Sequence, residues 1–229
     1  VGEEQAQSIL GKARALEVNF WDTADVYGGG LSESRIGRFA DKGGVFVATK
    51  LGRGSQFPGM TGYSRKHVKE SLAGSLQRLG GETLDLAQLH CIPTAVLADG
   101  EIFNIMDDLK SEGLMRHYGA SVESIEEGLM CLRHEGVATL QIIFNLFRQD
   151  AVSELLPQAE AQNVGIIVRL PLASGLLSGK FSKDTQFTAQ DHRNYNRDGQ
   201  AFSVGETFSG LPFEAGVALA DELKGRVPT

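Results

Sequence analysis

The chain has 229 residues, of which 41% are hydrophobic and 22% are charged, and its formal net charge is −7. This length supports one large domain or two small ones, each with a substantial core. The negative charge argues against nucleic acid or an anionic membrane as the main partner, although a local basic pocket for a phosphate stays open. No segment reads as a membrane span or a signal peptide, and Cys91 and Cys131 lack the spacing of a disulfide framework. We therefore expect a cytoplasmic protein.

The first half of the chain alternates amphipathic segments with short apolar runs. In the segment 64–79, an apolar stripe at helical spacing includes Val68 and Leu72, with Ser64 as an N-cap and Gly80 as the terminator. Ser32 is expected to be the N-cap of the helix over 32–41. The pattern predicts helices over 2–16, 32–41 and 64–79, and strands over 18–22, 45–50 and 84–90.

The second half continues the alternation. It predicts helices over 99–112, 122–134, 151–163 and near 211–226, and strands over 116–120, 138–144 and 165–170. The segment from Phe181 to Gly210 is expected to be neither helix nor strand. A loop of this length is typically functional or disordered. Two readings stay open, a lid over a cofactor or substrate whose Arg193 and Arg197 suit a phosphate, and a solvated loop.

Strands that alternate with helices run parallel, so the order predicts a parallel α/β fold. Six βα units are compatible with a doubly wound sheet or with part of a (β/α)8 TIM barrel. A dinucleotide-binding doubly wound fold usually carries Gly-x-Gly-x-x-Gly at an early strand–helix turn, and the run Gly28–Gly30 lacks that spacing. The barrel is therefore favoured, and we expect residues 1–229 to form one incomplete barrel domain.

Reactive side chains follow the first three apolar runs. The first run ends at Asp22, with Tyr27 five residues later, the second ends at Lys50 and the third at His90. Because parallel strands share the direction of their carboxyl ends, these side chains should gather on one face, where α/β enzymes hold their catalytic groups. The sequence thus indicates an enzyme. The other four histidines and the two cysteines show no metal-ligand spacing, so no metal is predicted.

These residues also carry a family resemblance. The stretch 22–28, then Ser32-Glu33 and Gly37, resembles the aldo-keto reductase signature, and Lys50 and His90 match the rest of that family's Asp, Tyr, Lys and His tetrad. The segments 119–121, 141–145 and 171–180 continue the match. The similarity is greater to the branch of bacterial general oxidoreductases and potassium-channel β subunits than to the aldose-reductase branch. It also implies a fragment that lacks the first and last barrel strands, which we expect to be a poor enzyme on its own.

The resemblance implies carbonyl reduction with a nicotinamide cofactor. Tyr27 would donate the proton, and the Lys50 ammonium would lower the phenol pKa from its usual value of roughly 10. Asp22 would pair with Lys50, and His90 would orient the carbonyl oxygen. Taken singly, each of these residues reads more simply as a packing or surface residue, and only their ordered placement on successive strand ends favours catalysis.

The same resemblance predicts cofactor contacts. Ser121 and Gln141 would hold the nicotinamide carboxamide, with Val122 where many relatives carry Asn or Arg, and Asp22 would lie beside the cofactor. Arg169 stands where other members place an aromatic ring on the nicotinamide. The pyrophosphate loop would comprise Pro171, Leu172, Ala173 and Ser174, with added charge from Lys180, whereas Leu176 and Leu177 are assigned to the core.

The overall prediction is an NADPH-dependent reductase of an aldehyde or ketone. The substrate, the preference for NADPH over NADH and the oligomeric state are not predicted. The alternative is a non-enzymatic subunit of the same family that holds a nucleotide and acts in redox sensing or regulation. An unrelated barrel aldolase with a Schiff base on Lys50 fits the pattern poorly, and borohydride trapping would detect it.

Overall fold

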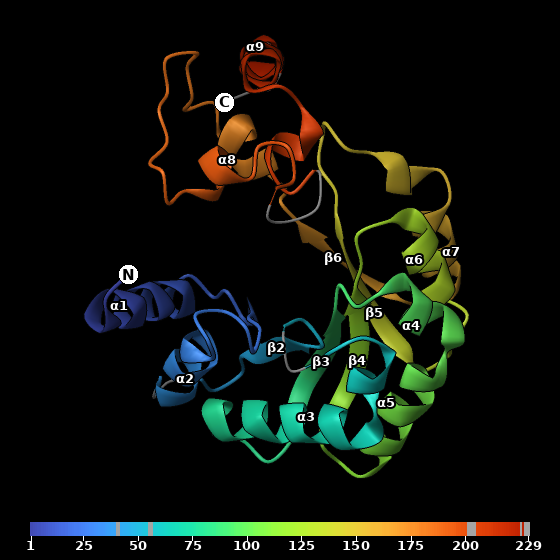
Figure 1. The fold of residues 1–229 in the computed structure, drawn as a ribbon. Coiled ribbons are helices and arrows are strands. Elements are labelled where there is room, and N and C mark those ends of the chain that lie inside the picture. Colours follow the sequence, from blue (N-terminus) through green and yellow to red (C-terminus); the bar gives the residue numbers. More distant parts are fainter. Residues whose placement is uncertain (40–41, 55–56, 201–204, 225, 227–229) are drawn as a thin grey trace. The chain divides into compact units, whose positions relative to one another are not determined.

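The computed structural model describes residues 1–39, 42–54, 57–200, 205–224 and 226 (Figure 1). The chain divides into two compact units, residues 1–140 with 158–165 and residues 141–157 with 166–229. Each unit is described by itself below. A single domain over residues 1–229 stays a prediction.

The first unit holds the amino-terminal helices and strands. Its helices are α1 (Glu3–Ala15), α2 (Leu31–Arg38), α3 (Arg65–Leu79), α4 (Thr94–Asp99), α5 (Glu101–Ser111) and α6 (Ile125–Cys131), with a 3-10 turn at Met60–Tyr63. Its strands are β1 (Phe20–Asp22), β2 (Phe46–Leu51), β3 (Leu84–His90) and β4 (Met115–Ser121). Three elements have residues in both units: β5 (Val137–Ile143), α7 (Leu155–Ala161) and β6 (Gly165–Arg169). The second unit adds α8 (His192–Tyr195), α9 (Phe213–Lys224) and 3-10 turns at Asp150–Val152, Ala173–Ser178 and Phe208–Gly210.

The strands form one six-stranded sheet in the order β1-β2-β3-β4-β5-β6. Parallel pairing sets Asp22 opposite Ala48 and Lys50 opposite Gln88. Strand β3 is buried along almost its whole length, which is typical of a parallel strand covered on both faces. The prediction of a parallel α/β fold built from βα units of the TIM-barrel kind is therefore confirmed.

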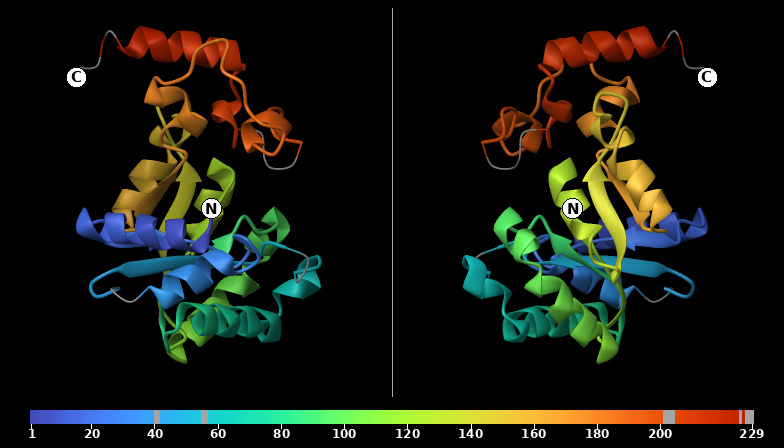
Figure 2. Two further views of the ribbon diagram at one scale, coloured as in Figure 1. Left: turned by 90° about the vertical axis from the view of Figure 1, so that its left-hand side faces the viewer. Right: turned by 90° about the vertical axis from the view of Figure 1, so that its right-hand side faces the viewer.

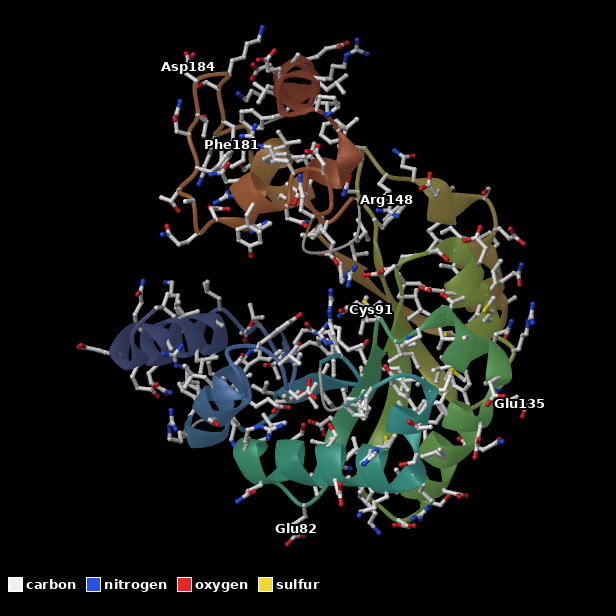
Figure 3. The ribbon with its side chains drawn as sticks, in the orientation of Figure 1. Glu82, Cys91, Glu135, Arg148, Phe181 and Asp184 are labelled. Carbon is white, nitrogen blue, oxygen red and sulfur yellow. The ribbon has the colours of Figure 1, made fainter. Side chains whose placement is uncertain are left out.

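Helices α3 and α5 pack beside each other along one side of these strands (Figures 1 and 2). The predicted stripe of α3 is present, since Val68 and Leu72 are fully buried. In α5 the fully buried Met106 and Leu109 make the matching face. By contrast, the labelled Glu82 and Glu135 point outward from this unit (Figure 3). This helical layer supports the strands whose ends carry the candidate site.

The predicted helices differ from the structure in several local details. The helix expected over 99–112 is α5, which starts at Glu101 because Gly100, with φ of 82°, separates it from α4, a helix that was not predicted. The helix expected over 151–163 is a 3-10 turn followed by α7. Helix α2 begins after Gly30, so Ser32 lies inside the helix and accepts a hydrogen bond from Thr23 instead of capping. Residues 40–41 and 225 of the predicted helices lie outside the described residues.

The described part of the segment 181–210 is packed and partly helical, contrary to prediction. It contains α8 and the turn Phe208–Gly210, and four phenylalanines meet there with ring centroids 5.0–6.1 Å apart: Phe181, Phe187, Phe208 and Phe213. Phe181 points into this cluster, whereas Asp184 points away from it (Figure 3). The predicted core residue Leu176 is buried against the same cluster, and Leu177 packs on it.

Candidate active site

The structure brings the four predicted catalytic residues together in the first unit. Asp22 is the last residue of β1, Lys50 is the last but one of β2, and His90 is the last of β3. Tyr27 lies in the turn between β1 and α2, which is tied to β2 by a hydrogen bond from the backbone N–H of Asp25 to the carbonyl of Lys50. Parallel pairing of neighbouring strands thus gathers an acid, a phenol, an ammonium and an imidazole.

Lys50 is the centre of this group. Its side chain is fully buried, and its ammonium donates to Asp22 Oδ2 at 2.5 Å and to the carbonyl of Thr23 at 2.7 Å. Gln88, opposite Lys50 on β3, donates to the other carboxylate oxygen of Asp22 at 3.4 Å. A buried ammonium is costly unless it is paired and hydrogen-bonded, and the contacts with Asp22 and Thr23 provide this compensation for Lys50.

The Tyr27 ring lies between Lys50 and His90. Lys50 Nζ is 4.9 Å from the ring centroid, and the His90 ring meets the Tyr27 ring edge-on at 5.8 Å between centroids and 84° between planes. His90 is buried, but Tyr27 is 41% exposed, so one side of the phenol faces outward. A cavity of about 500 Å³, lined mainly by apolar side chains of α1, β1 and α2, borders Asp22 and Tyr27. The group that would donate a proton is therefore accessible, as is Asp22, whereas Lys50 and His90 are buried.

Asp25 is a buried carboxyl in the same turn. Ser71 of α3 donates to its Oδ2 at 3.4 Å, and the carboxylate of Glu33 lies nearby. Burial, with a further contribution from Glu33, raises the pKa of Asp25 to about 6. Ionised Asp25 is thus disfavoured in the folded protein.

We expect Asp25→Asn to stabilise the protein at pH 8. The folded-state pKa of about 6 lies above the usual value of 3.8, so the free energy of unfolding falls as the pH rises between these values. Removal of the charge should recover about 3 kcal/mol at most, at roughly 1.4 kcal/mol per pKa unit. Urea unfolding at pH 8 and near pH 4 measures the gain, which should vanish at the lower pH. Asp184→Asn, at an exposed site, is the control. A gain that is equal at both pH values would contradict the raised pKa.

Ser121 is placed at the end of β4, next to the site. It is buried, its carbonyl accepts from the backbone N–H of Cys91, and its Oγ lies 3.6 Å from Cys91 Sγ. Cys91 follows His90 with a φ of +48°, an uncommon conformation for a non-glycine residue. Ser121 thus lies opposite His90 at the ends of neighbouring strands, and its contact with a cofactor stays a prediction.

The other predicted cofactor residues belong to the second unit. Gln141 is buried on β5, and Arg169 ends β6. The guanidinium of Arg169 forms an ion pair with Glu206 at 2.9 Å, between two side chains that are less than 20% exposed. Arg169 is therefore fixed by a carboxylate that the sequence did not reveal.

The segment predicted as the pyrophosphate loop includes the 3-10 turn Ala173–Ser178, and its role in cofactor binding stays a prediction. The Ser174 hydroxyl donates to the carbonyl of Glu206 and accepts from the backbone N–H of Phe208, so it ties the loop to a neighbouring segment. Pro171 and Leu172 are exposed, Ala173 is buried, and Lys180 is exposed. Ala173, Ser174 and Gly175 all have positive φ. The backbone N–H groups of such a run can face an anion. The backbone of this loop, and not the Ser174 hydroxyl, therefore suits a phosphate.

The two arginines of the segment 181–210 have structural partners. Arg193 bonds both carboxylate oxygens of Asp191, at 2.9 and 2.6 Å, and stacks over Phe187 at 4.6 Å. The Arg193 guanidinium lowers the pKa of Asp191 to about 2. Arg197 lies 5.7 Å from the centre of the Phe213 ring. In this structure both guanidinium groups support the aromatic cluster, which favours neither the lid reading nor the solvated-loop reading.

Among the described residues, no three His, Cys, Asp or Glu side chains are arranged to hold a metal ion. In the same part of the chain, no helix is both long enough and apolar enough to cross a membrane. His134 stacks on Phe103 with ring centroids 3.9 Å apart, in keeping with its assignment to packing.

Parallel strands that end in an acid, an ammonium and an imidazole, with a phenol in the adjoining turn, define an α/β protein with ionisable groups gathered at its strand ends. The Aldo/keto reductase family model matches residues 1–224. This chain belongs to the aldo/keto reductase family.

Individual relatives agree with this membership. A probable voltage-gated potassium channel subunit beta of Oryza sativa subsp. japonica is 33% identical, over 83% of this chain and 63% of the relative. The chain therefore spans less than two thirds of that relative. The structure of a glycerol dehydrogenase from Gluconobacter oxydans matches with a TM-score of 0.76 and 29% identity, over 96% of this chain and 66% of that one. The holo form of an aldo-keto reductase from Bacillus halodurans matches with a TM-score of 0.70 and 28% identity, over 82% and 64%.

Proposed function

We propose that this protein reduces an aldehyde or ketone to an alcohol, with Tyr27 as the proton donor and NADPH as the reductant. The proposal is carried by one observation, the fully buried Lys50 that is bonded to Asp22 and lies 4.9 Å from the Tyr27 ring. An ammonium this close favours the phenolate over the phenol and so lowers the barrier to proton donation. Family membership and the relatives that are oxidoreductases support the same reaction class.

Each residue has a separate task in this proposal. Tyr27 delivers a proton to the carbonyl oxygen as that oxygen gains negative charge. Lys50 stabilises the phenolate that remains, Asp22 holds Lys50 in place, and His90 donates a hydrogen bond that orients the substrate. A substrate can reach Tyr27, because this residue is 41% exposed.

The chemistry of the predicted cofactor residues supports the cofactor assignment. A bound NADPH would supply the hydride. Ser121 and Gln141 are buried polar side chains at strand positions and suit a carboxamide. Arg169 offers a planar cation fixed by Glu206, and the backbone around Ala173 suits a phosphate. The Ser174 hydroxyl is engaged within the protein, so we do not assign it to the phosphate.

The test is a steady-state assay with NADPH and with NADH against a panel of aldehydes and ketones. We expect turnover with at least one carbonyl class and faster turnover with NADPH. The second candidate function, a regulatory subunit that holds a nucleotide, is favoured by the similarity to the potassium channel β subunit. A tightly retained nucleotide with negligible turnover across the panel would support that function and contradict the reductase.

A further inference from the structure

Behind the Tyr27 turn lies an ion pair between two helices. Arg78 of α3 donates from Nε to Glu33 Oε2 of α2 at 2.6 Å, and from Nη2 to Ser75 at 3.3 Å. The Glu33 side chain is completely buried, while the Arg78 side chain is 32% exposed. A carboxylate buried to this degree requires a charged partner, and Arg78 supplies it.

Glu33 connects this pair to the strand that carries Lys50. Its other carboxylate oxygen accepts a hydrogen bond from the hydroxyl of Thr49, the residue before Lys50 on β2. Successive side chains of a strand point to opposite faces, so Thr49 faces the helices while Lys50 faces Asp22 and Tyr27. Any movement of Glu33 is thereby transmitted to the segment of β2 that positions the ammonium.

The backbone around Tyr27 is built to admit Arg78. Gly30, the residue before α2, has a φ of +87°, and a Cβ there would lie 2.7 Å from Arg78 Cδ. A Cβ at Gly37 of α2 would lie 2.0 Å from the Arg78 carbonyl oxygen. Both glycines therefore allow α3 and the Arg78 side chain to approach the turn and α2 closely. A cavity of about 270 Å³ is lined by Arg78, Asp25 and Ser71, among others.

We propose that Arg78, acting through Glu33, is a positioning residue that keeps the phenol of Tyr27 and the ammonium of Lys50 at their working separation. The inference rests on the proposed role of Tyr27 as the proton donor. Arg78 acts on the turn through Gly30 and on β2 through Glu33 and Thr49.

A purely structural ion pair would also lower stability when it is broken, so stability alone does not test the proposal. The informative variant is Arg78→Ala with added guanidinium ion, because removal of the Arg78 side chain, which lines the cavity of about 270 Å³, leaves space beside Glu33 for a small planar cation. We expect kcat to fall at least about ten-fold with KM nearly unchanged, since the loss concerns the geometry of proton donation. Millimolar guanidinium chloride should restore most of kcat, whereas equal sodium chloride should not. Arg38→Ala, which removes an exposed guanidinium from the same helix as Glu33, is the matched control.

A second measurement does not depend on turnover. In protein labelled at tyrosine Cζ for NMR, the Tyr27 signal is assigned by its loss in Tyr27→Phe, and its titration midpoint is followed with pH. Because Lys50 favours the phenolate, we expect the midpoint to rise in Arg78→Ala and to return with guanidinium. Wild-type kcat together with an unchanged midpoint in Arg78→Ala would overturn the proposal. If the wild type reduces no carbonyl but the midpoint shifts and is rescued, the reductase function fails and the positioning role stands.

Should Arg78→Ala not fold, Glu33→Gln provides the same test. The amide keeps the shape of the side chain but loses the charge that holds Arg78. We expect a lower kcat with KM nearly unchanged, and a raised Tyr27 midpoint. A variant with wild-type values of both would show that the ion pair does not position the site.

Discussion

Tyr27→Phe should reduce carbonyl turnover by roughly 10²–10⁴-fold, the usual contribution of a positioned proton donor. The substitution removes only the hydroxyl and keeps the ring that packs edge-on against His90 and beneath Lys50. NADPH binding, measured by fluorescence titration, should therefore be nearly unchanged.

Tyr63→Phe is the matched control for this substitution. It also loses one phenolic hydroxyl, which donates to the carbonyl of Gly52 at 2.7 Å. We expect it to cost about 1 kcal/mol of stability and to leave turnover close to the wild-type value. Turnover of Tyr27→Phe within a few-fold of wild type would remove Tyr27 from its assigned role.

Lys50→Met should abolish activity and also destabilise the protein. The methionine fills much of the buried space, but it carries no positive charge to stabilise the Tyr27 phenolate. It also leaves Asp22 without its ammonium partner. Asp22 is about a third exposed, so water relieves part of the penalty, and we expect a loss of roughly 2 kcal/mol rather than the ~3–5 kcal/mol of a fully buried pair.

A double-mutant cycle with Asp22→Asn tests the pair directly. If the two side chains interact as the 2.5 Å contact indicates, the combined loss in unfolding free energy should be smaller than the sum of the single losses by about 1 kcal/mol or more. Additive losses would mean that the pair is energetically independent. Lys69→Met, which breaks an exposed pair with Glu112, should change the stability by about 1 kcal/mol or less.

The four reactive residues could be predicted to meet because each follows an apolar run, and parallel strands share the direction of their ends. The bounds of β3 are those expected, and those of α3 differ by one residue, since buried stripes and a terminating glycine are local signals. Gly100 is a local signal that the prediction over 99–112 did not use, since it lies just before α5 and separates it from α4, which was not predicted.

The supporting residues could not be found in the same way. Arg78 is 45 residues from Glu33, and Glu206 is 37 residues from Arg169. An ion pair of this kind leaves no periodic or spacing signal, because it forms only when two separate elements have packed. Gln88 is similar, since its position opposite Lys50 follows from strand register. The hydrogen bond from the Ser174 hydroxyl to the carbonyl of Glu206 could not be predicted for the same reason, because the two residues are far apart in the sequence.

The run Gly28–Gly30 limits how this protein can be altered by directed evolution. All three residues have positive φ, of 61°, 63° and 87°, which disfavours any side chain except that of Asn or Asp. Gly29 has no neighbouring atom within 4 Å of an added Cβ, so the restriction there comes from the backbone and not from crowding. At Gly37 the reason is reversed, because an added Cβ would meet the Arg78 carbonyl. A library that seeks new substrates should therefore spare this stretch and place its diversity in loops that have both room and ordinary backbone angles.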